Sequence, residues 1–175
     1  MSQFFDIDKC QDYIETLSNR HKDVNHNVDG IKAFARNHSD SEMTDLKNFP
    51  GKNVVVIHTI SGHRVGDRDD KAVQREMWIR FASYADNSTE DEIKAAQKRA
   101  EAIMFDFIGE MERKQEADLD ADEDCGIMHY LRPEEFHWEE IEDEPWLLNH
   151  YGYDLLVPFR MNMPAFDQSK WRAEM

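Results

Sequence analysis

Histidine is the first residue type in this chain that could perform chemistry, because an imidazole can bind a metal or exchange a proton near neutral pH. The sequence contains eight histidines. His58 and His63 lie five positions apart and His129 and His137 eight, and neither pair belongs to an HExxH, an HxH or a Cys/His array. We therefore expect no metal site. His58 lies in an apolar run, which predicts a hydrogen-bonded core histidine.

Carboxylates are the second candidate set. Residues 118–126 have the composition of a calcium loop, but an EF-hand requires Gly at position six and Glu at position twelve. Neither a register beginning at Asp118 nor one beginning at Asp120 supplies them. The glutamates within 134–140 are numerous enough for a glycosidase pair. On an alternating strand, however, we expect them to form a solvated face.

Nucleophilic and phosphate-binding motifs are the third set. The sequence has no GxSxG elbow, and Cys10 and Cys125 lie far apart without any signature of a nucleophile, as expected for free thiols in a reducing compartment. The two glycines of 62–66 match neither GxGxxG nor GxxxxGK[ST], which favours a hairpin loop. The residues therefore predict no enzyme and no cofactor. The absence of an N-terminal signal or a long apolar run predicts a soluble protein made in a cytoplasm.

Net charge is the strongest compositional feature. The formal charge is −16, and residues 110–144 hold 15 acidic residues against Arg113, Lys114 and Arg132. Binding of nucleic acid through its phosphates requires basic surface, so this balance argues against it. An acidic stretch is usually a solvated loop, but it can also repel DNA or bind a basic partner.

The elements that must position these residues follow from hydrophobic periodicity. Apolar residues at helical spacing predict a helix over 6–17, capped by Asp6 or Asp8, and a shorter helix over 29–36. A β-branched run predicts a strand over 54–60 that is buried on nearly both faces, and alternation over 77–84 predicts a second strand. We expect these two strands to form an antiparallel hairpin with a charged tip.

The second half of the chain is again predicted to form a helix followed by two strands. A capping box at Thr89 and Glu92 begins a helix that is predicted to end near Gln115. An acidic loop over 118–132 and two strands over 136–141 and 155–161 follow, and Pro158 predicts an edge or bulge. The fold class is therefore α+β, in the order helix-β-β-helix-β-β, with helices packed on an antiparallel or mixed sheet.

We expect one domain over 1–175, made of a helical N-terminal region (1–48), an α+β core (49–162) and a C-terminal arm (163–175). Most aromatic residues, Trp78 and Trp138 included, are expected in the core. Other residues in turns, in the hairpin loop or in the arm are predicted to form an interface, because large amphipathic rings often anchor one. The predicted interface set is His63, Arg64, Arg68, Trp146, Tyr151, Phe166 and Trp171.

The layout resembles the tail-terminator (tail-completion) and neck proteins of tailed bacteriophages and phage-tail-like particles. The resemblance rests on 46–50 leading into the strand 54–60, on 77–84 preceding the helix 89–111, and on the ending 136–141, 149–153 and 155–161. It implies a structural virion protein that is assembled in the host cytoplasm and forms a six-membered ring. Such a homo-oligomer joins the tail tube to the head or connector, with DNA passing unbound, and has no catalysis, cofactor or membrane contact.

Two other functions remain open on the sequence. One is an acidic protein-binding module or a DNA-mimicking inhibitor, which the concentration of carboxylates in one region supports only partly. The other is a small hydrolase or metal enzyme whose site is assembled from distant residues. Self-association favours the ring, salt-sensitive binding to a basic partner favours the module, and stoichiometric metal favours the enzyme.

Overall fold

The computed structural model describes residues 6–36, 53–65, 72–86, 89–120, 128–141 and 149–162. Five strands form one sheet in the order β1-β2-β3-β5-β4, in which β1 pairs with β2 in parallel and the other neighbours are antiparallel. This confirms the predicted α+β class with helices packed on a mixed sheet. The elements are α1 (Ile7–Arg20), β1 (Phe34–Arg36), β2 (Val54–Val65), β3 (Ala72–Tyr84), α3 (Glu90–Asp120), the 3-10 helix η1 (Pro133–Glu135), β4 (His137–Glu140) and β5 (His150–Asn162).

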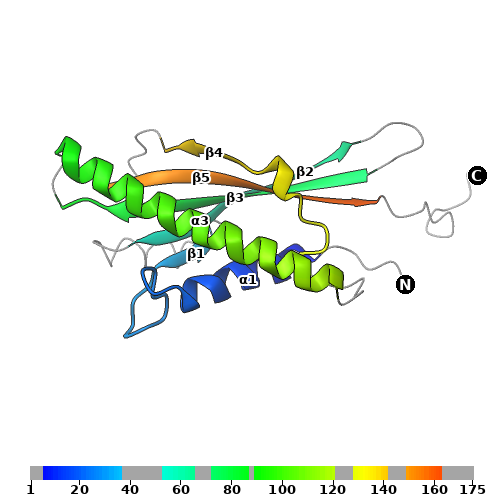
Figure 1. Cartoon of the computed structure of the whole chain (residues 1–175), viewed down its shortest axis with the longest axis horizontal. Coiled ribbons are helices and arrows are strands. Elements are labelled where there is room, and N and C mark those ends of the chain that lie inside the picture. The colour runs from blue at the N-terminus through cyan, green and yellow to red at the C-terminus, as the bar shows by residue number, and fades with distance from the viewer. Residues whose placement is uncertain are drawn as a thin grey trace, which may run out of the picture.

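Helices α1 and α3 lie on the same side of the sheet, where α3 crosses the strands diagonally and α1 lies beside it (Figure 1). The main core lies between these layers, and α1 contributes Ile14, the sheet Ile79 and α3 Phe107. Within the described residues, no helix is long and apolar enough to span a membrane.

Helix α1 begins where the sequence predicted. The Asp6 carboxylate accepts hydrogen bonds from the backbone N–H groups of Asp8 and Lys9, at 3.2 and 3.3 Å, so Asp6 is the cap. The helix runs three residues past the predicted end at Leu17, to Arg20. Its buried stripe packs on the sheet, and this burial stabilises the helix.

The predicted helix over 29–36 is wrong, because this segment is a loop that leads into strand β1. Asp29 and Gly30 have φ values of 51° and 77°, in the left-handed region that a right-handed helix excludes. The N–H groups of Ala33 and Phe34 both donate to Nδ1 of the buried His26 at 3.1 Å. The side chain of His26 thus takes backbone donors that a helix would have bonded internally.

The hairpin of β2 and β3 is confirmed and is longer than predicted. Val54, Val55, Val56 and Ile57 are all buried, as expected for a strand covered on both faces. The register shifts between Ile57 and Thr59, which places a bulge at His58. The strands continue to Val65 and from Ala72, so the predicted hairpin loop over 62–66 is wrong for residues 62–65, which belong to β2. Residues 66–71 lie outside the described residues.

Helix α3 carries the predicted apolar stripe, with Ala96, Ala100 and Phe107 buried. It extends to Asp120 rather than to Gln115, so the predicted acidic loop begins too early. Asp118 is buried at this end and accepts the Met128 N–H at 3.1 Å, which extends the helix into contact with the following segment. Residues 121–127 of that predicted loop lie outside the described residues.

Strand β5 lies between β3 and β4, so the prediction of an edge strand at Pro158 is wrong. The pairing of β4 ends at His137 opposite Leu156, before Pro158 is reached. The Pro158 carbonyl accepts from the Arg132 N–H at 3.0 Å, on the side away from β3. Pro158 has no backbone N–H, and its nitrogen points towards the isolated bridge between Leu131 and Phe159 and away from β3. The proline therefore removes no hydrogen bond between β5 and β3.

Close approach of helix to sheet depends on Gly152. A Cβ at this position would lie 1.9 Å from the Phe81 carbonyl oxygen and 2.9 Å from the Ala100 Cβ. Gly152 is part of strand β5, where the absence of a side chain allows α3 to cross.

Candidate functional site

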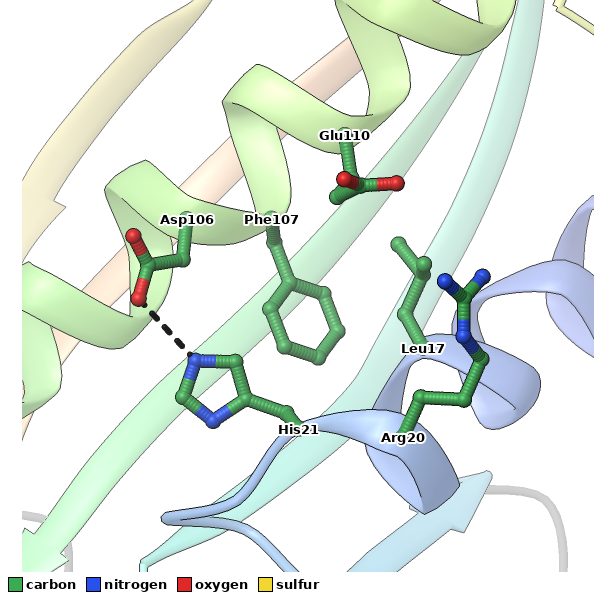
Figure 2. Close-up of a pocket in the computed structure, with 6 residues that line it drawn as sticks. All are labelled: Leu17, Arg20, His21, Asp106, Phe107 and Glu110. Carbon is green, nitrogen blue, oxygen red and sulfur yellow. Dashed lines mark hydrogen bonds and ion pairs between the residues drawn. The ribbon is translucent and has the colours of Figure 1, made fainter.

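A pocket of about 290 Å³ opens between α1 and α3 (Figure 2). Leu17 and Phe107 supply its apolar lining, while His21, which follows the end of α1, faces Asp106 of α3. Arg20 and Glu110 complete the lining from the two helices. The pocket therefore combines an apolar surface with charges of both signs.

The His21 imidazole is fixed on both nitrogens. Its Nδ1 accepts the backbone N–H of Asp23 at 3.2 Å, so the proton of the ring resides on Nε2. That Nε2 lies 3.1 Å from Oδ2 of Asp106. A general base needs a free nitrogen directed at its substrate, and this arrangement leaves none. We interpret His21 as a link between the two helices.

None of the described residues that line the pocket is Ser, Thr or Cys, so its described lining supplies no hydroxyl or thiol nucleophile. The Tyr13 hydroxyl donates to the Glu110 backbone carbonyl at 3.2 Å, which adds a second link between α1 and α3. A hydrogen bond from Arg113 lowers the pKa of the Glu110 carboxyl, so this group remains an anion at neutral pH. The charged side chains of the described lining are thus engaged in contacts within the chain, His21 with Asp106 and Glu110 with Arg113.

A second polar cluster lies on the face of the sheet opposite the helices. Arg80 of β3 donates from Nε and Nη2 to the two oxygens of Asp154 of β5, at 2.8 and 2.6 Å. His58 of β2 places Nε2 3.5 Å from Oδ1 of the same carboxylate, and its ring lies 6.4 Å from that of Trp78. Arg80 and Asp154 are both buried. The predicted core histidine is thus paired with a carboxylate, at the margin of the core.

The cluster holds Asp154 strongly ionised. Burial by itself raises the pKa of this carboxyl, but hydrogen bonds from Arg80 and His58, and their charges, lower the pKa to about 2. These contacts join β2, β3 and β5 on this face of the sheet.

The structure places the predicted interface residues apart. His63 and Arg64 are exposed near the tip of the hairpin, opposite Gln74 and Val73 of β3. Tyr151 is half-buried and pairs with Ser83, at the other end of the same strand. The remaining four predicted interface residues lie outside the described residues, and so does the C-terminal arm: Arg68, Trp146, Phe166 and Trp171.

Sequence reasoning missed the pairing of Arg80 with Asp154 and misplaced Trp138. A charged residue flanked by Ile79 and Phe81 was a usable signal, but its partner lies 74 positions away. Trp138 was expected in the core, whereas it is 41% exposed on the edge strand β4. All four residues of β4 are exposed, so its tryptophan has no full layer to pack against.

No group of three or more His, Cys, Asp or Glu side chains suited to a metal ion occurs in the described parts of the chain. No protein-family model matches the sequence, and no curated protein or solved structure is significantly similar to it.

Proposed function

We propose that this chain is a non-enzymatic assembly subunit that forms a ring, in the manner of a tail-terminator or neck protein joining a tail tube to a head or connector. The observation that carries the proposal is the free edge of the hairpin. Strand β1 pairs with β2 only from Val55 to Ile57, whereas β2 continues to Val65. No other strand in the described residues pairs with this edge, and such edges bind other chains readily.

Exposure and charge support the same surface. Residues 61–64 are all exposed. Residues 61–76 are neutral overall in a chain of −16, because four basic residues balance four acidic ones: Arg64, Arg68, Lys71 and Arg75 against Asp67, Asp69, Asp70 and Glu76. Copies of a strongly acidic protein repel one another, and the repulsion is smallest where the local charge is not negative. The hairpin is therefore a favourable place for contact between subunits.

The order of elements also agrees with the resemblance to tail-terminator proteins. A long hairpin precedes a helix that crosses the sheet, and a long strand closes the fold, as Figure 1 shows. In a closed ring each hairpin would contact a different surface of the neighbouring subunit. The acidic charge elsewhere on the chain would let DNA pass without binding, because like charges repel the phosphates.

Light scattering and sedimentation over a range of concentrations test this proposal, together with electron microscopy of negatively stained particles. We expect particles of several times 20.7 kDa with a central opening. Arg64→Glu should shift the population towards monomer. Lys98→Glu makes the same charge change at an exposed site on α3 and should leave assembly intact. A wild-type chain that stays monomeric at high concentration and does not bind tail-tube protein contradicts the proposal.

A further inference from the structure

Strand β4 leaves half of its backbone groups facing away from the sheet. The Ile141 N–H donates to the Gly152 carbonyl at 3.0 Å, so this backbone position faces β5. Backbone groups alternate in direction along an antiparallel strand, so those of His137 and Glu139 also face β5. Those of Trp138 and Glu140 point outward, where no other described strand pairs with them.

Two large aromatic rings lie beside this free edge. Trp138 of β4 is 41% exposed and Phe105 of α3 is 45% exposed. Their ring centroids are 5.6 Å apart at an interplanar angle of 84°, an edge-to-face pair. Exposed apolar surface of this kind marks interaction sites when it is contiguous. The pair forms an apolar platform next to unpaired backbone donors and acceptors.

The surroundings of the platform are acidic. Residues 133–140 carry four exposed glutamates and no lysine or arginine. Glu101 of α3 and Glu140 of β4 both act on the Tyr153 hydroxyl, whose pKa is raised by burial and by these two carboxylates. Both carboxylates therefore lie near the Tyr153 hydroxyl, and the Glu140 carboxylate also accepts a hydrogen bond from Gln97 of α3, the helix that carries Phe105.

Charged residues on an edge strand often serve only to prevent pairing with other sheets. That role does not require an exposed tryptophan and phenylalanine at the same place. The glutamates repel acidic segments and attract basic ones, so the surface selects a partner by charge. Pairing of this edge with the same edge of a second copy is disfavoured, because each edge carries four exposed glutamates.

We propose that the β4 edge binds an extended, basic segment of another protein as an added strand. Backbone bonds form with Trp138 and Glu140, an apolar side chain of the segment packs on Phe105 and Trp138, and Lys or Arg side chains meet Glu101 and Glu140. This inference does not depend on the ring, which we assign to the hairpin of β2 and β3, at a different place in the strand order.

The probe is a fluorescein-labelled peptide of alternating arginine and valine, and the comparison peptide has glutamate at each arginine position. Fluorescence anisotropy with the full chain should show the basic peptide binding at least about tenfold more tightly, with affinity that falls as salt rises. Trp138→Ala should weaken binding about tenfold, whereas Leu119→Ala, which removes another exposed apolar side chain, on α3, should not.

Glu101→Gln should weaken binding several-fold and reduce its salt dependence. Asp106→Asn is the matched control, since it removes an exposed charge from the opposite flank of the same helix. Thermal melts verify that each variant is folded. Phe105→Ala replaces Trp138→Ala if the tryptophan variant unfolds.

Amide hydrogen exchange tests the strand geometry directly. On peptide binding, the amides of Trp138 and Glu140 should become protected, while those of His137 and Glu139, already directed at β5, should change little. Equal binding of the acidic peptide, indifference to Trp138→Ala, or unchanged exchange at Trp138 overturns the inference. Self-association that depends on Trp138 also overturns it, because it assigns the edge to a second copy. If the chain forms no ring of subunits but still binds the basic peptide, only the proposed function is contradicted.

Discussion

The two faces of the sheet differ in what they bury, although both include apolar side chains, among them Val54 and Val56 on the face opposite the helices. On the helix-covered face, Ile79 and Phe81 of β3 pack against apolar side chains of α1 and α3. On the opposite face, Arg80 of the same strand is buried in a bidentate ion pair with Asp154. Apolar burial is non-directional, whereas an ion pair requires one geometry. We infer that the first face supplies most of the stability, and that the second fixes the register of β3 against β5.

The largest effect should come from the apolar face. Phe107→Ala removes a ring that is buried and packs edge-to-face on Phe81 at 5.1 Å. We expect a loss of about 3 to 5 kcal/mol in the free energy of unfolding, with little dependence on pH. Chemical denaturation measures it. Phe105→Ala, two positions away but exposed, should cost less than about 1 kcal/mol, and equal losses in the two variants would contradict the layer assignment.

The next largest effect should come from the charged face. Asp154→Asn keeps the shape of the side chain but leaves the buried guanidinium of Arg80 without its counter-charge, at a cost of about 3 kcal/mol. The double replacement Arg80→Met with Asp154→Leu should recover most of this loss, since buried ion pairs are often no better than well-packed apolar residues. A double variant as unstable as the single one would assign the pair a net stabilising role.

Acid should weaken the charged face selectively. The pKa of Asp154 is about 2 in the folded chain and lies near its ordinary value of about 3.9 when unfolded. As the pH falls, the unfolded chain binds the proton first, so the stabilisation is complete above about pH 5 and is lost towards pH 2. The expected loss is about 2 kcal/mol. Denaturation at a series of pH values should show that Asp154→Asn loses less unfolding free energy between pH 5 and pH 2 than the wild-type chain does. The same loss in both proteins would refute the role given to Asp154.

The smallest effect belongs to the rim of the pocket. Asp106 contacts His21 at 3.1 Å, but its side chain is 69% exposed. Exposed pairs of this kind contribute little because water and salt screen them, so Asp106→Asn should change the free energy of unfolding by less than about 1 kcal/mol. Thermal denaturation at low and high salt measures this. A larger loss would place His21 and Asp106 among the main stabilising contacts.

Local pattern was sufficient for elements whose signal lies within one segment. The Asp6 cap, the apolar stripe of α3 and the hairpin of β2 and β3 were predictable, because capping and periodicity are properties of neighbouring residues. The helix predicted over 29–36 was wrong because its structure depends on a residue outside the segment. The apolar residues of the segment suit either a helix or a strand, and His26 accepts hydrogen bonds from the backbone N–H groups of Ala33 and Phe34, which a helix would use internally.

By itself, the sequence determined the class of the fold, the positions of the longer elements and the acidic charge. The tertiary structure alone decided that Arg80 meets Asp154 across 74 positions, that β4 lies at an edge, and that Trp138 is exposed. The physical reason is that periodicity states which residues share a face of an element. Which elements become neighbours, and which faces remain uncovered, depends on the packing of the whole chain.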